Sequence, residues 1–149
     1  MLRDVGFEEV VPAVMTDLPD GADQVVLDLP ETLPRVHADA SLLERAIANV
    51  IENALQWSPR DQHVRVSAGS FGSTVDLRVV DCGPGVAAEQ REAIFRPFQR
   101  LGDSPNGAGV GLGLAVARGF VEAMGGHVSV DDTPGGGLTV TMSLPRADA

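Results

Sequence analysis

Four polar side chains are spaced along one predicted helix in a way that could bind a metal ion. Asn49, Glu52, Asn53 and Gln56 recur at intervals of three and four, which places them on one stripe beside the apolar face of the helix. Asparagine inside a helix is less favourable than alanine by roughly half a kcal/mol. An amide oxygen can ligate Mg²⁺ while phosphate oxygens fill the other positions. A solvated polar face, or amides bonded to neighbouring strands, accounts for the same spacing.

An acidic residue stands at the end of a predicted buried strand, and two glycines follow it. Asp81 is succeeded by Gly83 and Gly85. A buried carboxylate needs hydrogen-bond donors. The exocyclic amino group of a purine could supply one, with the ring lying against the bare backbone of the glycines. Backbone amides of the turn are the alternative donors.

The segment 94–100 combines two aromatic rings with two cations. Phe95 and Phe98 are most simply residues of a core or an interface. Arg96 and Arg100 are candidate phosphate contacts, because a guanidinium binds phosphate oxygens in a bidentate manner. Solvation of each arginine taken singly is the alternative.

A run of glycines, 107–113, leads into another predicted helix. Gly109, Gly111 and Gly113 alternate with small or apolar residues, Leu112 among them. Free amides before a helix N-terminus can cradle an anion. The spacing fits neither the dinucleotide-binding fingerprint nor the P-loop, which needs a lysine. A hinge loop without a ligand is the alternative.

Hydrophobic periodicity predicts the elements that position these residues. A helix is expected over about 41–57, capped by Asp39 or Ser41, and a strand over 74–81 directs Asp81 toward the core side. The other predicted elements are helices over 7–16, 88–95 and 111–124 and strands over 24–29, 63–68, 128–130 and 138–144. This order predicts an α/β two-layer fold in one domain, 1–149, rather than a doubly wound parallel sheet.

Composition excludes several functions. The 149 residues carry a formal charge of −10, so general binding to nucleic acid or to an anionic membrane is disfavoured. All 11 basic residues are arginines, which removes every mechanism that needs a lysine. No apolar run approaches the roughly 18 residues of a membrane span. One cysteine, Cys82, excludes a disulfide framework, and a cytoplasmic setting is expected.

Taken together, these motifs resemble the catalytic ATP-binding domain of bacterial sensor histidine kinases, within the superfamily that also contains gyrase, heat-shock protein 90 and MutL. The resemblance covers nearly the whole chain and is strongest to the potassium-responsive KdpD subgroup. Its N box, first glycine box, F box, second glycine box and third glycine box correspond to 49–59, 81–86, 94–100, 109–114 and 135–144.

The resemblance implies a Bergerat-type sandwich in which a mixed β-sheet backs three helices and ATP lies under a mobile lid at about 102–110. Asn53 would ligate Mg²⁺, with Asn49 assisting at the phosphates, and Asp81 would accept a hydrogen bond from adenine. Nucleotide contacts are further implied for Gln56, Gly83, Gly85, Arg100, Gly109, Gly111, Leu112, Gly113 and Thr139. The γ-phosphate would pass to a histidine on a separate dimerisation domain of the same kinase, and from there indirectly to a response regulator.

The sequence departs from the family pattern at three positions. Gln56 stands where lysine is usual, Trp57 where tyrosine is usual and Leu138 where threonine is usual. A water-mediated contact to adenine would therefore have to come from Thr139 or elsewhere. None of the three histidines has the surroundings of a phosphoacceptor. The phosphoacceptor is therefore expected outside this chain. The resemblance also implies that the domain is the cytoplasmic part of a membrane-bound sensor, without membrane contact of its own. A docking module with negligible transfer and a serine-directed anti-sigma-factor kinase are the alternatives.

Overall fold

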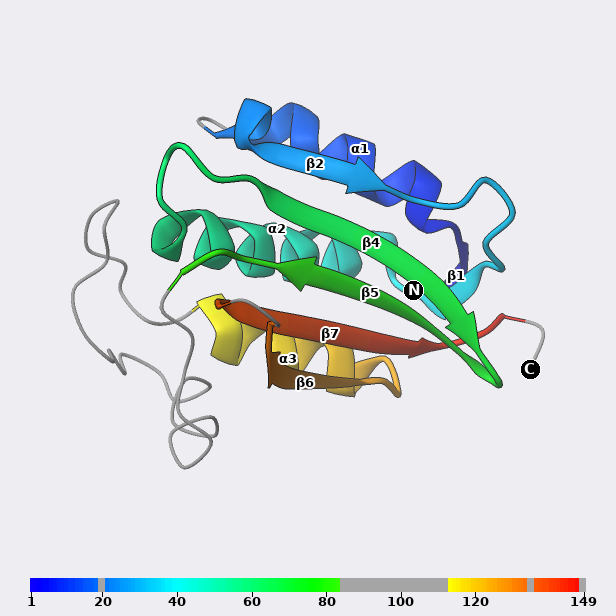
Figure 1. Cartoon of the computed structure of the whole chain (residues 1–149). Coiled ribbons are helices and arrows are strands. Elements are labelled where there is room, and N and C mark those ends of the chain that lie inside the picture. The colour runs from blue at the N-terminus through cyan, green and yellow to red at the C-terminus, as the bar shows by residue number, and fades with distance from the viewer. Residues whose placement is uncertain (19–20, 84–112, 134–135, 148–149) are drawn as a thin grey trace.

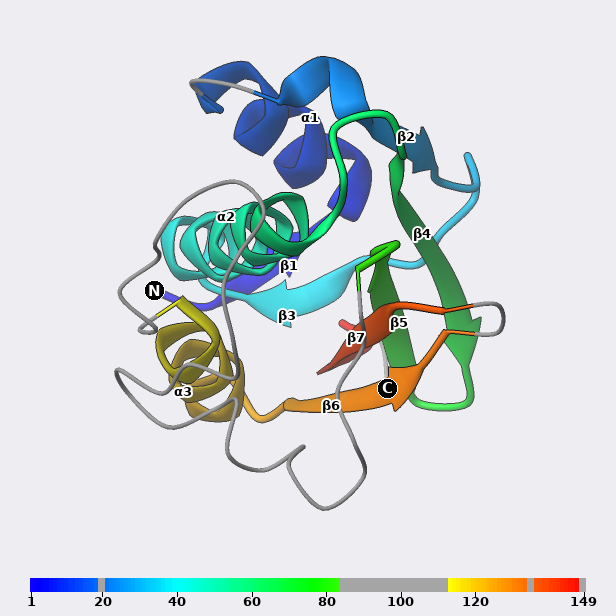
Figure 2. The ribbon, with the colours of Figure 1, turned by 60° about the vertical axis from the view of Figure 1, so that its left-hand side comes forward.

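The computed structural model describes residues 1–18, 21–83, 113–133 and 136–147. Within these ranges a mixed sheet of five strands carries three helices on one face, so the predicted two-layer α/β fold is confirmed (Figures 1 and 2). The strand order is β2-β4-β5-β7-β6; β2 is parallel to β4 and the remaining neighbours are antiparallel. The strands are β2 (Val25–Asp28), β4 (Val64–Phe71), β5 (Thr74–Val80), β6 (His127–Asp132) and β7 (Leu138–Pro145).

The helices form one layer on the sheet, with α2 between α1 and α3 (Figure 2). Alternation along β5 and β7 directs one set of side chains toward these helices and the other toward the open face of the sheet. The helices are α1 (Phe7–Asp17), α2 (Ala40–Trp57) and α3 (Gly113–Ala123). The core between the layers includes Leu43, Ala46, Ile47, Val50, Ile51, Ala54, Val75, Leu77, Val79, Leu138, Val140, Met142 and Leu144.

Helix α2 is the central helix, and its ends follow from its sequence. Asp39 caps the N-terminus, where its carboxylate accepts a hydrogen bond from the Leu42 amide at 3.1 Å. The helix ends at Trp57, and Ser58 is its extended C-cap, because the following Pro59 disfavours a helical conformation for the residue before it. Of the two caps that the sequence allowed, Asp39 is the one observed.

A small second sheet was not predicted. Strand β1 (Arg3–Val5) pairs antiparallel with β3 (Val36–Ala38), which lies more than thirty positions later in the chain. Three-residue strands are too short to show a period of two, and their pairing is not local. Val5, Val36 and Ala38 are fully buried, so this sheet closes one end of the core.

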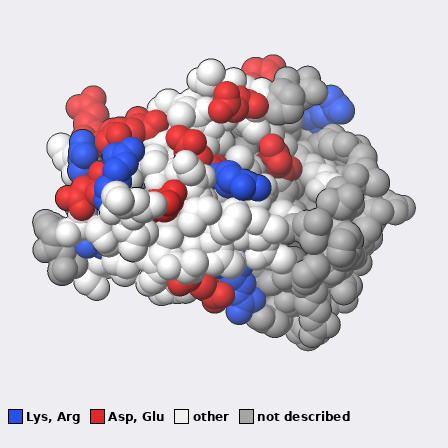
Figure 3. Space-filling view, turned by 180° about the vertical axis from the view of Figure 1, so that it is seen from behind, with Lys and Arg blue, Asp and Glu red and all other residues white. Residues whose placement is uncertain are grey.

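The helical side of the molecule carries both signs of charge. Seen from that side, acidic and basic side chains stand in small separate groups with uncharged surface between them (Figure 3). Within the described residues this face therefore presents scattered cations, some of them among acidic side chains, rather than a continuous basic field. None of the described helices is both long and apolar enough to cross a membrane.

Candidate nucleotide-binding site

The predicted acid lies where three elements meet. Asp81 directly follows β5, and its amide donates to the Leu138 carbonyl at the start of β7, at 2.9 Å. The next residue is tied to the end of α2, because the Cys82 amide donates to the Ser58 hydroxyl at 3.1 Å. The end of the sheet and the end of the polar stripe are thereby brought together.

The carboxylate of Asp81 is buried and only half satisfied. Asp81 is 3% exposed, and its Oδ1 accepts hydrogen bonds from the amides of Gly83 at 3.0 Å and Leu138 at 2.9 Å. No donor among the described residues reaches Oδ2. Burial raises the pKa of Asp81 above its ordinary value, and the two backbone hydrogen bonds oppose that shift. The turn amides predicted as alternative donors are present, yet one buried acceptor remains available to a ligand.

Two glycines allow the backbone to close around this acid. A Cβ on Gly137, whose φ is +105°, would collide with the Asp81 carbonyl oxygen. A Cβ on Gly83 would lie 2.7 Å from the Trp57 carbonyl oxygen, closer than real Cβ contacts. Gly83 therefore lets the predicted base-binding turn pack directly on the C-terminal end of α2.

Ser58 is a site-forming residue that the sequence analysis missed. Its side chain is fully buried, and its hydroxyl fixes the turn after Asp81. This contact ties the end of α2 to the turn after β5 and so holds the two halves of the site in register. The available signal was a serine at the predicted end of a helix, immediately before proline.

The polar stripe lies on α2 as the spacing predicted. Asn49, Asn53 and Gln56 are half-buried and Glu52 is exposed. Gly113, the first residue of α3, packs on Asn49: a Cβ there would lie 3.5 Å from the Asn49 carbonyl oxygen and 3.7 Å from its Cβ. The N-terminus of α3 is thus brought to the middle of the stripe, the arrangement that an anion on free helix amides would need.

Thr139 is not brought to the acid. It belongs to β7, where alternate residues face opposite sides of the sheet; Leu138 is buried on the helical side. The Thr139 hydroxyl instead shares a hydrogen bond of 3.0 Å with the hydroxyl of Thr133. Its predicted role at adenine gains no support from this position.

Several predicted residues lie outside the described ranges. They are Gly85, Phe95, Arg96, Phe98, Arg100, Gly109, Gly111 and Leu112, together with the lid at about 102–110 and the helix at 88–95. Within the described residues, no group of three or more histidine, cysteine or carboxylate side chains could hold a metal ion. A magnesium ion at the stripe would depend on amide oxygens and on the phosphates themselves.

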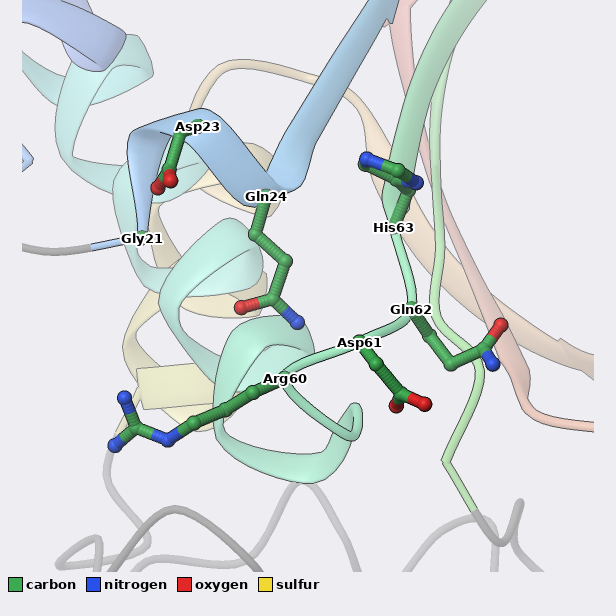
Figure 4. A pocket seen from close by; sticks show the side chains of 7 residues that line it. All are labelled: Gly21, Asp23, Gln24, Arg60, Asp61, Gln62 and His63. Atoms are coloured by element: carbon green, nitrogen blue, oxygen red, sulfur yellow. The ribbon is translucent and has the colours of Figure 1, made fainter.

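A polar hollow lies next to the site but contains none of the predicted residues. It is formed by the turn before β2 and the loop from α2 to β4 (Figure 4). The amide of Gln24 crosses it to donate to the Pro59 carbonyl at 2.9 Å. The hollow is lined by Gly21, Asp23, Gln24, Arg60, Asp61, Gln62 and His63.

Comparison with known families assigns this architecture. Residues 38–148 match the family described as histidine kinase-, DNA gyrase B- and HSP90-like ATPase. The chain belongs to this family, which confirms the resemblance drawn from the glycine and asparagine motifs.

Individual relatives agree with that assignment. The chain is 49% identical to the sensor protein KdpD of Rathayibacter rathayi, over 99% of this chain and 17% of that protein. It is 35% identical to KdpD of Escherichia coli K12, over 96% of this chain and 16% of that protein. The chain therefore spans about one sixth of the length of these relatives.

Solved structures show the same fold. The mycobacterial sensor histidine kinase MprB superimposes with a TM-score of 0.84 at 28% identity, covering 98% of both chains. Full-length ShkA in complex with AMPPNP superimposes with a TM-score of 0.81 at 29% identity, covering 98% of this chain and 31% of that one.

Proposed function

We propose that the chain binds MgATP and donates its γ-phosphate to a histidine on a separate dimerisation domain of the same sensor kinase. The observation that carries this proposal is the buried Asp81 carboxylate, which keeps one oxygen open within the described residues. The adenine amino group is a donor of the right kind for that oxygen.

The phosphate end is assigned to the stripe on α2. Asn53 would ligate Mg²⁺, Asn49 would contact the phosphates, and the amides at the start of α3 would face the same group. Bound Mg²⁺ would neutralise negative charge that develops on the transferring phosphoryl group. The residues of this chain act by positioning and by electrostatic stabilisation. AMPPNP in the related ShkA is an ATP analogue, which supports the nucleotide assigned here.

The acceptor is assigned to another domain because the histidines of this chain are poorly suited to the role. His37 lies in β3, His63 precedes β4 and His127 begins β6. All three are exposed, and none is in a helix. In the reaction the bond from the γ-phosphorus to its bridging oxygen breaks, ADP departs, and a bond forms to a ring nitrogen of the acceptor. A response regulator would then receive the phosphoryl group.

Transfer between separate domains tests the proposal. A purified dimerisation domain of a KdpD-type sensor is incubated with this chain, Mg²⁺ and ATP labelled at the γ-phosphate. We expect acid-labile, base-stable label on that domain, and none when its helical histidine is replaced by alanine.

One observation favours a second function, that of a nucleotide-binding or docking module with negligible transfer. Gln56 stands where the family usually has lysine, so one phosphate charge is missing. ATP binding without labelling of the acceptor would support this alternative and contradict the kinase proposal.

A further inference from the structure

One cation extends the polar stripe of α2. Arg45 precedes Asn49 by four residues, and Asn49 precedes Asn53 by four. Side chains at this interval lie one above the other on a helix, about 5–6 Å apart. Asp81 lies near the opposite end of α2, because the turn that follows it packs on Trp57 and Ser58. A nucleotide that starts at the acid and passes Asn53 and Asn49 therefore has Arg45 as the next stripe residue at its phosphate end.

A ring on α3 holds the guanidinium on the same side of α2. Phe120 follows Gly113 by seven residues, which returns it to the same face of α3 two turns later. That face contacts α2, because Gly113 packs on Asn49. The Arg45 guanidinium carbon lies 5.5 Å from the centre of the Phe120 ring, within the range of a cation–π contact. The side chain is therefore directed toward α3 rather than away from it.

The charge of Arg45 is not neutralised by the described part of the chain. The ion pairs found there use other basic groups, namely Met1, Arg35, His37 and Arg118. Arg45 is itself exposed. The chain has no lysine, and Gln56 is neutral. A triphosphate that reaches the middle of the stripe would find in Arg45 an available cation on α2.

We infer that Arg45 contacts the terminal phosphate of the bound nucleotide and selects triphosphate over diphosphate. Phe120 is its positioning residue, since the ring limits where the guanidinium can lie. This inference rests on the proposed function: it specifies which residue supplies charge at the phosphate end of that same site.

Calorimetric titration with AMP, ADP and ATP in the presence of Mg²⁺ tests the inference. In Arg45→Gln, which removes the charge and retains a polar chain, we expect ATP affinity to fall about tenfold or more. ADP affinity should change less than threefold and AMP affinity should not change. Phe120→Leu should weaken ATP selectively as well, by about threefold, because the guanidinium loses its platform.

Arg78→Gln is the matched control. Arg78 also stacks on an aromatic ring, with its guanidinium carbon 4.9 Å from the centre of Phe71, but it lies on β5 among the residues that alternate with the buried ones. Its replacement should leave all three affinities unchanged. Wild-type ATP affinity in Arg45→Gln, or an equal loss for all three nucleotides, would overturn the inference while the proposed function stands. Absence of any binding to the wild-type chain would overturn both.

Discussion

Asp81 carries a cost in the free protein that a ligand would relieve. Its carboxylate is buried with a raised pKa, chiefly because burial disfavours the charged form. A group whose pKa is higher in the folded than in the unfolded state binds more protons when folded. Its contribution to stability is present below the unfolded pKa and is lost as pH rises through the folded pKa. The ionised form of the side chain therefore opposes folding.

Replacement of this acid by its amide should separate stability from binding. Asp81→Asn retains an oxygen that can accept from Gly83 and Leu138 and removes the buried charge. We expect a midpoint of thermal unfolding at pH 7 equal to or above that of the wild type. The advantage should shrink as pH falls through the raised pKa of Asp81 and stay constant below about 3.8. Asp131→Asn, at an exposed site on β6, is the control. A lower midpoint at pH 7 would contradict this description of the site.

The metal assignment rests on one amide. In Asn53→Ala the Mg²⁺-dependent part of ATP affinity should disappear, because the ion loses its protein ligand. The measurement compares ATP titrations with Mg²⁺ and with a chelator. Ser41→Ala, at an exposed position in the first turn of the same helix, should retain the difference. Undiminished stimulation by Mg²⁺ in Asn53→Ala would remove this residue from the site.

At the scale of elements, the turn before β7 shapes the site through its backbone. Gly136 and Gly137 have positive φ values of +115° and +105°. They differ in surroundings: a Cβ on Gly136 meets nothing within 4 Å, whereas one on Gly137 collides with the Asp81 carbonyl. Substitution of Gly136 therefore tests backbone strain alone, whereas substitution of Gly137 tests strain together with steric displacement of Asp81.

Gly136→Ala should cost about 1–2 kcal/mol of unfolding free energy, as expected for an L-residue forced into a left-handed conformation. Gly137→Ala should cost clearly more and should also abolish nucleotide binding, since Asp81 must move. Urea denaturation followed by ATP titration measures both effects. Equal losses of stability with binding retained in both variants would show that the close approach to Asp81 is unimportant.

The elements that the sequence predicted well are those with strong local signals. Apolar residues at intervals of three and four predicted α2, and the alternation of apolar and polar residues predicted β5. The burial of Asp81 could be predicted because it continues the alternation of the buried residues of β5. Strands β1 and β3 could not be predicted, because three residues such as Arg3–Val5 show no period and pair across a long separation. The role of Ser58 was also hidden, since it depends on a contact with Cys82, twenty-four positions away.

At the scale of the whole molecule, the fold brings remote segments to one place. The end of α2, the turn after β5, the start of α3 and the start of β7 converge (Figure 1). Each motif in these segments, taken alone, also had a purely structural interpretation. The order of the motifs along the chain is what made the family resemblance recognisable. The orientation of Thr139 follows from alternation along β7, in which its neighbours Leu138 and Val140 are buried on the helical side.

The central claim is that a buried acid reads the adenine base, and a competition between purines tests it most directly. Calorimetric titration of the wild-type chain with MgATP and MgGTP should show ATP bound at least about tenfold more tightly, because guanine presents an acceptor where adenine presents its amino group. In Asp81→Asn, ATP affinity should fall by about tenfold or more. Failure of the wild-type chain to bind ATP, or the same ATP affinity in Asp81→Asn, would contradict the account.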